Sequence, residues 1–328
     1  MISAPDFAKK QILFVFASDG DKLSFLNDNI VVRDKTGKIK HQSTCYRLFI
    51  IFVIGNLTIT SGLIQRAQKF GFTICLMNRN MKLYDSFGAA MNSNTLLRRK
   101  QYDYSGLDIG KHIIENKIIN QRDALRGIRM RTKTMDQAIL KLGSYIDKLK
   151  ENDYSLQEIM GIEGLAARLY FKEMFRDYSW EGRRPRIKRD YINSTLDIGY
   201  TILFNILEGL IGAYGFDKYQ GVFHTNFYMR KSLVCDLIEP FRPLIDLQVR
   251  KSLNYGQCKG EDFEKYGERY LLKWAMSPKY TSFLAKSVID RKQDLFRYVQ
   301  GYYRAFMKEK QACDYPVFCL RENAISKL

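Results

Sequence analysis

The chain of 328 residues contains little histidine, little proline and no paired cysteine motif. Its six prolines leave residues 6–184 free of proline, so long helices are permitted there. None of the six cysteines forms a CxxC pair, which argues against structural zinc and favours reduced thiols in a cytoplasmic protein. The longest apolar run, residues 48–54, is far shorter than the roughly 20 residues that span a bilayer, and no signal-peptide pattern is visible. We therefore expect a cytoplasmic protein without a membrane span.

Acidic residues are also scarce. The chain has 53 Lys and Arg against 35 Asp and Glu, a formal net charge of +18. Both the first 95 residues and the remainder carry a basic surplus, so the charge does not come from a tail. A distributed surplus of this kind favours binding to the phosphate backbone of nucleic acid, with an affinity that falls in salt. The alternative, a basic protein without a nucleic-acid partner, stays open at this point.

Short strands are predicted for the N-terminal part of the chain. Strand-like runs occupy residues 11–16, 22–26, 29–33, 38–41, 48–60 and 72–77, with a turn at 34–37 and one short helix at 62–69. Small and polar residues at 86–94 (SFGAAMNSN) mark a domain boundary. We predict an α+β fold, in which residues 1–88 form a β-rich, sandwich-like dimerisation domain and residues 89–328 form an all-α catalytic domain.

A helical period replaces the strand pattern after residue 95. Apolar residues recur at helical spacing in two successive segments: Ile114, Ile118, Leu125 and Ile128, then Met135, Ile139, Leu142 and Ile146. A long apolar helix is predicted for 190–215, and amphipathic helices are predicted for 265–276 and 283–310. The catalytic domain is therefore expected to be built from long helices.

Two basic segments are candidates for DNA contact. Arg122, Arg126, Arg129 and Lys133 recur at spacings of four, three and four, which predicts a basic stripe on the outer face of the first helical region. A loop at 180–189 carries Arg183, Arg184 and Arg186 among its five basic residues. A solvated helix face is the competing interpretation of the stripe.

One of the three histidines precedes a pair of closely spaced acids. His224 is followed by Asp236 and Glu239, which share one face if the segment is helical. Glu163 in the helix-patterned segment QEIMGIEGLAARLYFKEMF could supply a further ligand. One imidazole with two or three carboxylates suits Mg²⁺ or Mn²⁺ better than zinc. The alternative is an ordinary histidine beside helix-face acids.

Four ordered motifs carry a family resemblance. EGLAARLYF, NSTLDIGYTIL, GVFH and SLVCDLIEPFRPLID occur in this order, and further similarity extends to the N-terminus. Together they resemble the CRISPR-associated integrase of the adaptation module, the Cas-one family. The resemblance implies that Glu163, His224 and Glu239 bind the metal and that Asp236 ligates it, orients His224 or accepts a proton. It also implies that Arg242, Tyr200 and Asn193 line the DNA site.

The resemblance further implies a function and partners. A homodimer would join short double-stranded DNA, the prespacer, to the ends of the first CRISPR repeat by metal-dependent transesterification, with nuclease and disintegration activity at the same site. A dimer of the small protein Cas-two would bridge two such dimers, and a need for Cas-four is left open. Asp197 departs from the family pattern, which usually reads L-N-Y-G-Y where this chain reads L-D-I-G-Y. Two other functions remain in view: a structure-specific DNA repair nuclease and a non-catalytic nucleic-acid scaffold.

Overall fold

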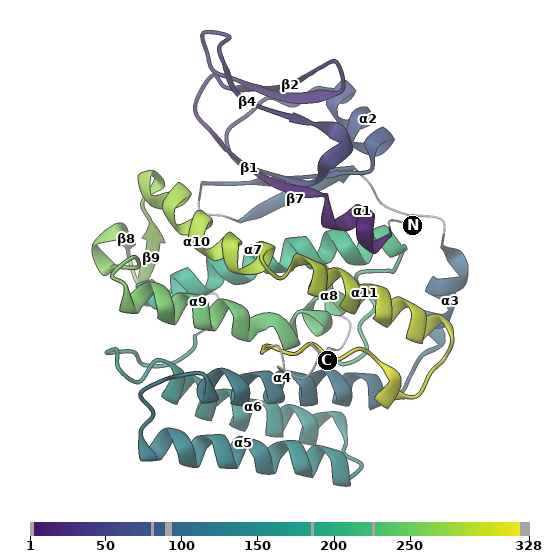
Figure 1. The fold of residues 1–328 in the computed structure, drawn as a ribbon, viewed down its shortest axis with the longest axis vertical. Coiled ribbons are helices and arrows are strands. Elements are labelled where there is room, and N and C mark those ends of the chain that lie inside the picture. Colours follow the sequence, from purple (N-terminus) through teal and green to yellow (C-terminus); the bar gives the residue numbers. More distant parts are fainter. Residues whose placement is uncertain (1–2, 80–81, 89–93, 185–186, 225–226, 322–328) are drawn as a thin grey trace.

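The computed structural model describes residues 3–79, 82–88, 94–184, 187–224 and 227–321. Its strands are β1 (Gln11–Ala17), β2 (Lys22–Leu26), β3 (Asn29–Arg33), β4 (Ile39–Thr44), β5 (Leu48–Gly55), β6 (Thr73–Met77), β7 (Leu83–Gly88), β8 (Phe263–Tyr266) and β9 (Arg269–Leu272). Its α-helices are α1 (Ala4–Ala8), α2 (Ser61–Phe70), α3 (Thr95–Asp103), α4 (Asp108–Arg126), α5 (Lys133–Glu151), α6 (Leu156–Met174), α7 (Tyr191–Tyr214), α8 (Ser232–Leu237), α9 (Arg242–Asn254), α10 (Ser277–Ile289) and α11 (Lys292–Met307). The β-rich part lies at one end of the molecule and α4, α5 and α6 lie at the other (Figure 1). The predicted α+β fold is confirmed.

Two sheets form the N-terminal part. The first has the order β1-β5-β6-β7, with β7 antiparallel to the other three strands. The second is the antiparallel meander β2-β3-β4. Apolar residues from both sheets and from α2 make a common core between them. The arrangement is a small sandwich, as the sequence predicts, although β5 ends at Gly55 rather than running to residue 60.

Strand β5 explains why the longest apolar run of the chain lies here. Ile51 and Val53 face the core between the two sheets, whereas Ile50, Phe52 and Ile54 belong to the core shared with the helices. Successive side chains of a strand point to opposite faces, so a strand covered on both sides is apolar throughout. The first sheet therefore packs directly on the helical part.

Helix α7 forms the centre of the helical part. Asp190 caps its first turn, and Gly215 ends it in the left-handed conformation with φ 85°. It is long and apolar enough to cross a membrane by composition alone, but 72% of its most apolar window is buried inside the protein. Its contacts with the sheet on one side and with α9, α10 and α11 on the other account for that composition (Figure 1).

Two expectations about the helical part are wrong. Residues 265–276 do not form a helix, because they contain most of the hairpin β8–β9, so the larger part is not all-α. Gly267 (φ 59°) is the first residue of its two-residue turn, a position that favours glycine in tight hairpins. The basic stripe does not lie on one helix, because α4 ends at Arg126 and Lys133 begins α5.

Candidate metal and DNA site

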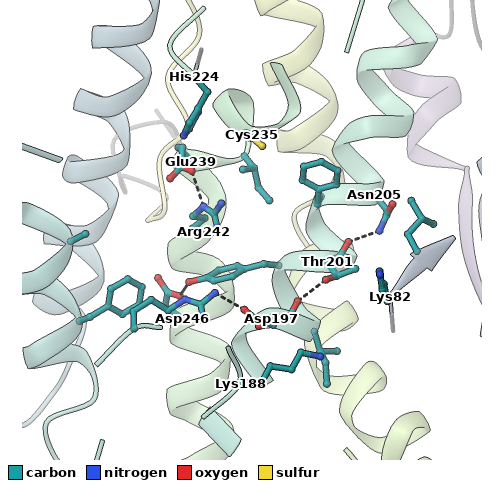
Figure 2. Close-up of a pocket in the computed structure, with 18 of the residues that line it drawn as sticks. Lys82, Lys188, Asp197, Thr201, Asn205, His224, Cys235, Glu239, Arg242 and Asp246 are labelled. Carbon is teal, nitrogen blue, oxygen red and sulfur yellow. Dashed lines mark hydrogen bonds and ion pairs between the residues drawn. The ribbon is translucent and has the colours of Figure 1, made fainter. Parts of the chain in front are cut away.

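A single cleft gathers the three predicted metal ligands and three of the predicted DNA-binding residues. Its volume is about 990 Å³, and it is lined by residues from α4, α6, α7 and α9, from the loop before α8, from β9 and from the N-terminal sheet. Glu163, His224, Glu239, Arg242, Tyr200 and Arg183 all line it. Figure 2 shows His224, Glu239 and Arg242 together on one side of the cleft. Segments more than 60 residues apart in the sequence thus meet in one place.

Glu163 and Glu239 are joined by a lysine that the sequence analysis did not select. Lys117 of α4 forms an ion pair with Glu163 of α6, and its Nζ lies 2.5 Å from Oε2 of Glu239. The Lys117 side chain is only 9% exposed. Burial would lower the pKa of Lys117, but the carboxylates of Glu239 and Glu163 outweigh this effect and raise it. Lys117 is therefore a buried, charged ammonium between the two acids.

Glu239 is held as a carboxylate by two cations. It begins a short 3₁₀ turn (Glu239–Phe241) between α8 and α9, and Arg242 at the start of α9 donates Nε to its Oε1 at 3.0 Å. Burial would raise the pKa of Glu239, but Arg242 and Lys117 outweigh it and hold the value at about 2. The group therefore stays ionised throughout the physiological range.

Asp236 anchors the histidine loop. Its Oδ2 accepts backbone N–H bonds from Val222 (2.7 Å) and Phe223 (3.1 Å), and its Oδ1 accepts one from His224 (2.9 Å). Nδ1 of His224 lies 2.6 Å from the same Oδ1. The Asp236 side chain is fully buried, so both oxygens are committed to the loop and the ring. Of the roles left open for Asp236, the geometry favours orientation of His224, which leaves Nε2 as the nitrogen that can ligate a cation.

Steric crowding explains why the GVFH motif begins with glycine. A Cβ at Gly221 would lie 2.7 Å from Oδ2 of Asp236, 2.8 Å from the carbonyl oxygen of His224 and 2.8 Å from Cβ of Ser232. Real Cβ atoms essentially never approach other atoms this closely. Only glycine lets the loop sit against the Asp236 carboxylate.

A second buried carboxylate supports the floor of the cleft. Asp246 accepts a hydrogen bond from Tyr170 (2.9 Å) and another from Tyr200. Burial raises the pKa of Asp246 to about 6, because these hydrogen bonds and the nearby guanidinium groups offset only part of its effect. The guanidinium carbon of Arg242 lies 4.7 Å from the centre of the Tyr200 ring, and that of Arg183 lies 5.2 Å from it. Tyr200 is thus fixed between Asp246 and two cations.

The basic loop is tied to the first turn of α7. Arg183 donates to Oδ1 of Asn193 at 2.9 Å and pairs with Asp197 at 2.5 Å. The backbone N–H of Arg184 also donates to Oδ1 of Asn193 at 2.9 Å. Asn193 is buried and holds this loop without lining the cleft itself, while Arg186 lies outside the described residues. Asp197, the departure from the family pattern, therefore serves as a partner for Arg183.

Four further cations line the cleft. They are Lys82, which immediately precedes β7, Lys188 of the basic loop, Arg230 and Arg269 of β9. None of the four makes an ion pair with any residue that the structure describes, and Nε of Arg230 is buried without a hydrogen-bond partner there. Lys82 and Lys188 appear on two other sides of the cleft in Figure 2. Unpaired cations in a cleft this large offer binding sites for phosphate groups.

The predicted stripe does not belong to this cleft. None of its four residues lines the cavity. Arg122 and Arg126 both lie 3.4 Å from Asp123, and Arg129 and Lys133 are exposed in and after the connection that follows α4. A glycine ends α4 here: a Cβ at Gly127 would lie 2.4 Å from Nη2 of Arg321. The four residues remain candidates for an outer DNA contact only.

The donor set fits a hard divalent cation, with one difference from a closed metal site. In the described ranges, no three His, Cys, Asp or Glu side chains are grouped closely enough to form one. Lys117 instead holds Glu163 and Glu239. Oε2 of Glu239 is buried and accepts no hydrogen bond from the described residues, although the ammonium lies close to it. By their chemistry, carboxylate oxygens and one imidazole nitrogen suit Mg²⁺ or Mn²⁺.

The residues that the sequence analysis missed are Lys117, Asp246 and the cleft cations. Lys117 and Gln121 lie one turn apart on α4, in a segment whose apolar period predicts only a helix. Both lie on the buried face of that helix. The polar residues of α4 that are buried in the protein are Asn116, Lys117, Asn120 and Gln121. Four polar residues on an otherwise apolar face are a signal of a buried site or network, and this signal was present in the sequence.

Fold and site together define an α+β protein with a cationic cleft built around two acids and an oriented histidine. Residues 14–285 match the family described as CRISPR associated protein Cas1, so the chain belongs to that family. This confirms the resemblance carried by the four sequence motifs.

The similar proteins agree with this assignment. CRISPR-associated endonuclease Cas1 1 of Thermodesulfovibrio yellowstonii is 29% identical over 276 residues, which cover 79% of this chain and 86% of the relative. CRISPR-associated endonuclease Cas1 1 of Archaeoglobus fulgidus is 28% identical over 276 residues, covering 75% and 79%. Among solved structures, a casposase bound to integration product matches 97% of both chains with a TM-score of 0.77 and 21% identity. A Cas6-RT-Cas1–Cas2 complex matches 96% of this chain with a TM-score of 0.80 and 21% identity, but the chain spans only 36% of that longer chain. At these identities the structures establish the fold.

Proposed function

We propose that this protein is a metal-dependent DNA integrase that inserts short foreign DNA at the leader-proximal CRISPR repeat, with endonuclease and disintegration activity at the same site. The observation that carries the proposal is the convergence of Glu163, His224 and Glu239 from three separate segments on one cationic cleft. The family membership supports the same chemistry, because its curated relatives are named endonucleases.

Glu163, His224 and Glu239 would hold Mg²⁺ or Mn²⁺. When bound, such a cation offsets the charge that develops on the phosphate oxygens and favours attack by a 3′-hydroxyl. Asp236 keeps the His224 ring in place and accepts a hydrogen bond from its Nδ1–H. Arg242 keeps Glu239 ionised and, beside Tyr200, can bind a phosphate of the attacked strand. The protein's part of the mechanism is to orient ligands and to neutralise charge.

The proposed substrate is double-stranded DNA: the prespacer, whose 3′-ends are joined, and the CRISPR repeat, which is attacked. Lys82, Lys188, Arg230 and Arg269 would bind its backbone. We further propose a homodimer. We also propose a Cas-two partner, in line with the similar structure of a Cas6-RT-Cas1–Cas2 complex. A need for Cas-four stays a prediction.

A strand-transfer assay tests the proposal. The purified protein, with and without Cas-two, is incubated with a labelled short duplex and a supercoiled plasmid that carries a leader and repeat, in Mg²⁺, Mn²⁺ or EDTA. We expect label joined at the repeat borders in either metal, none in EDTA, and none with Glu163→Ala or His224→Ala. Cleavage without joining under every condition would favour the repair nuclease, and full activity of both variants would favour a different site.

A further inference from the structure

Lys117 occupies the position between the two proposed metal ligands. Its ammonium contacts Oε1 of Glu163 and Oε2 of Glu239, and the side chain is almost completely buried. Arg242 balances Glu239 from its other oxygen, Oε1. The formal charges of these four side chains cancel, so the group is neutral.

A divalent cation and this ammonium cannot both use the same carboxylate oxygens. Two positive charges within a few ångströms repel strongly in a poorly solvated site. A metal ion that binds Glu163 and Glu239 must therefore displace Lys117. The bound metal adds two positive charges to this neutral group of four side chains. The displaced ammonium of Lys117 no longer has a carboxylate partner, so the cleft then favours an anionic ligand.

We propose that Lys117 is a displaceable counter-ion that couples metal binding to DNA binding. In the metal-free protein it neutralises Glu163 and Glu239. When the metal enters, Lys117 swings away from the carboxylates and binds a DNA phosphate in the same cleft. The inference rests on the proposed metal site and adds a role for a residue that the family motifs in this sequence did not indicate.

The cleft contains a second place for the displaced ammonium. Gln121 lies one turn beyond Lys117 on the same face of α4, and both line the cleft. Within the described part of the chain, Oε1 of Gln121 is buried and has no hydrogen-bond partner. It can accept a hydrogen bond from the ammonium after Lys117 leaves the carboxylates. Lys117 therefore has two sets of hydrogen-bond acceptors. It contacts the carboxylates of Glu163 and Glu239 in the absence of metal, and Oε1 of Gln121 is available once it leaves them.

Linkage makes the consequence measurable. If the metal favours the swung position of Lys117 and DNA phosphate favours the same position, each ligand must raise the affinity for the other by the same factor. A coupling of about fivefold or more is the usual size of such effects. Removing the ammonium should abolish the coupling, because the carboxylates then carry no competing charge.

Manganese binding tests this directly. The Mn²⁺ affinity of the full-length protein is measured by titration calorimetry and by the EPR signal of free Mn²⁺, without DNA and with a short duplex whose 3′-ends are dideoxy-terminated and unreactive. We expect the duplex to tighten Mn²⁺ binding to the unmodified protein by about fivefold or more. Lys117→Met should bind Mn²⁺ about fivefold more tightly without DNA, and the duplex should change its affinity by less than about twofold. Lys111→Met is the matched control, because Lys111 lies on the same helix and pairs at 3.7 Å with exposed Asp153.

The outcomes separate the alternatives. Weaker or unchanged Mn²⁺ binding by Lys117→Met, with a normal melting temperature, would overturn the proposal. So would an unmodified protein whose Mn²⁺ affinity is unaffected by the duplex, a result that needs no variant to fold. Lys117→Gln, which keeps a hydrogen-bond donor without the charge, provides a second variant. Coupling of Mn²⁺ and DNA binding without strand transfer would overturn the proposed function and leave this inference intact. Strand transfer without that coupling would overturn this inference and leave the proposed function intact.

Discussion

Nδ1 of His224 lies 2.6 Å from Oδ1 of Asp236, a carboxylate that is fully buried and also accepts three backbone N–H groups of the same loop. One side chain thus determines both the path of the loop and the orientation of the ring. The hydrogen bonds come from residues 222–224, at least 12 positions earlier in the chain. The histidine is therefore placed by a tertiary contact.

Replacing Asp236 with Asn should impair catalysis more than stability. The Asn side-chain amide has only one acceptor oxygen. It cannot accept hydrogen bonds from both the loop N–H groups and the imidazole as the carboxylate does. We expect strand transfer to fall by about 10–100-fold, the usual effect of losing a group that orients a metal ligand. Strand-transfer rate and melting temperature measure the two effects. Asp147→Asn, on the exposed face of α5, is the control, and an unimpaired Asp236→Asn protein would contradict the assigned role.

Gly221→Ala should displace the histidine loop. The added Cβ would lie 2.7 Å from Oδ2 of Asp236, so the loop or the carboxylate must shift, at a cost of about 1–3 kcal/mol in the free energy of unfolding. Chemical denaturation and strand transfer should both show the loss. Gly143→Ala on α5 is the matched control, because nothing lies within 4 Å of its Cβ position and alanine favours a helix by about 0.5–1 kcal/mol. Equal effects at the two positions would argue against the close packing seen here.

Lys188→Ala and Arg269→Ala should weaken DNA binding without abolishing metal binding. Each removes one proposed phosphate contact, so the slope of log affinity against log salt should become shallower by about 0.9 per contact on duplex DNA. Fluorescence anisotropy at several salt concentrations measures this slope. Lys148→Ala removes an exposed charge on α5, outside the cleft, and should leave the slope nearly unchanged. Unchanged slopes for both cleft variants would exclude these residues as phosphate contacts.

Asp246 should make the protein less stable as the pH rises from about 4 to about 6. Burial raises its pKa in the folded protein to about 6, against about 3.9 for an unfolded chain. Between these values the native state binds more protons than the unfolded state, so stability falls with rising pH by about 3 kcal/mol in total and then levels off. The groups facing Asp246 are two tyrosines, Tyr200 and Tyr170, and two arginines, Arg242 and Arg183.

The Asp246→Asn protein isolates this contribution. It should lack the fall in stability between pH 4 and 6, whatever its absolute stability. Urea unfolding at half-unit pH intervals gives the two curves, and their difference is the contribution of Asp246. Parallel curves would show that Asp246 titrates normally in the folded protein.

The hydrophobic patterns predicted most of the elements but not the hairpin β8–β9. Its strands are only four residues each, and residues 265–276 contain apolar residues at spacings that also suit a helix. The signal that decides against the helix is Gly267 in the turn. The predicted basic stripe is not continuous on one helix for a related reason: its spacing of four and three residues runs past Arg126, where α4 ends.

By itself, the sequence determined which chemistry the chain can offer and which state most of its segments adopt, helical or extended. The ordered motifs indicated the family, and residue types and spacing pointed to Glu163, His224, Asp236 and Glu239. Only the tertiary structure decided how these residues share a cleft: Asp236 orients the histidine, Lys117 joins the two acids, and Asn193 supports a loop instead of lining the site. The physical reason is the sequence range over which each property is set. Periodicity is set by neighbours within a few residues, whereas the charge of a buried carboxylate is balanced by whichever group the packing of distant helices brings within about 3 Å.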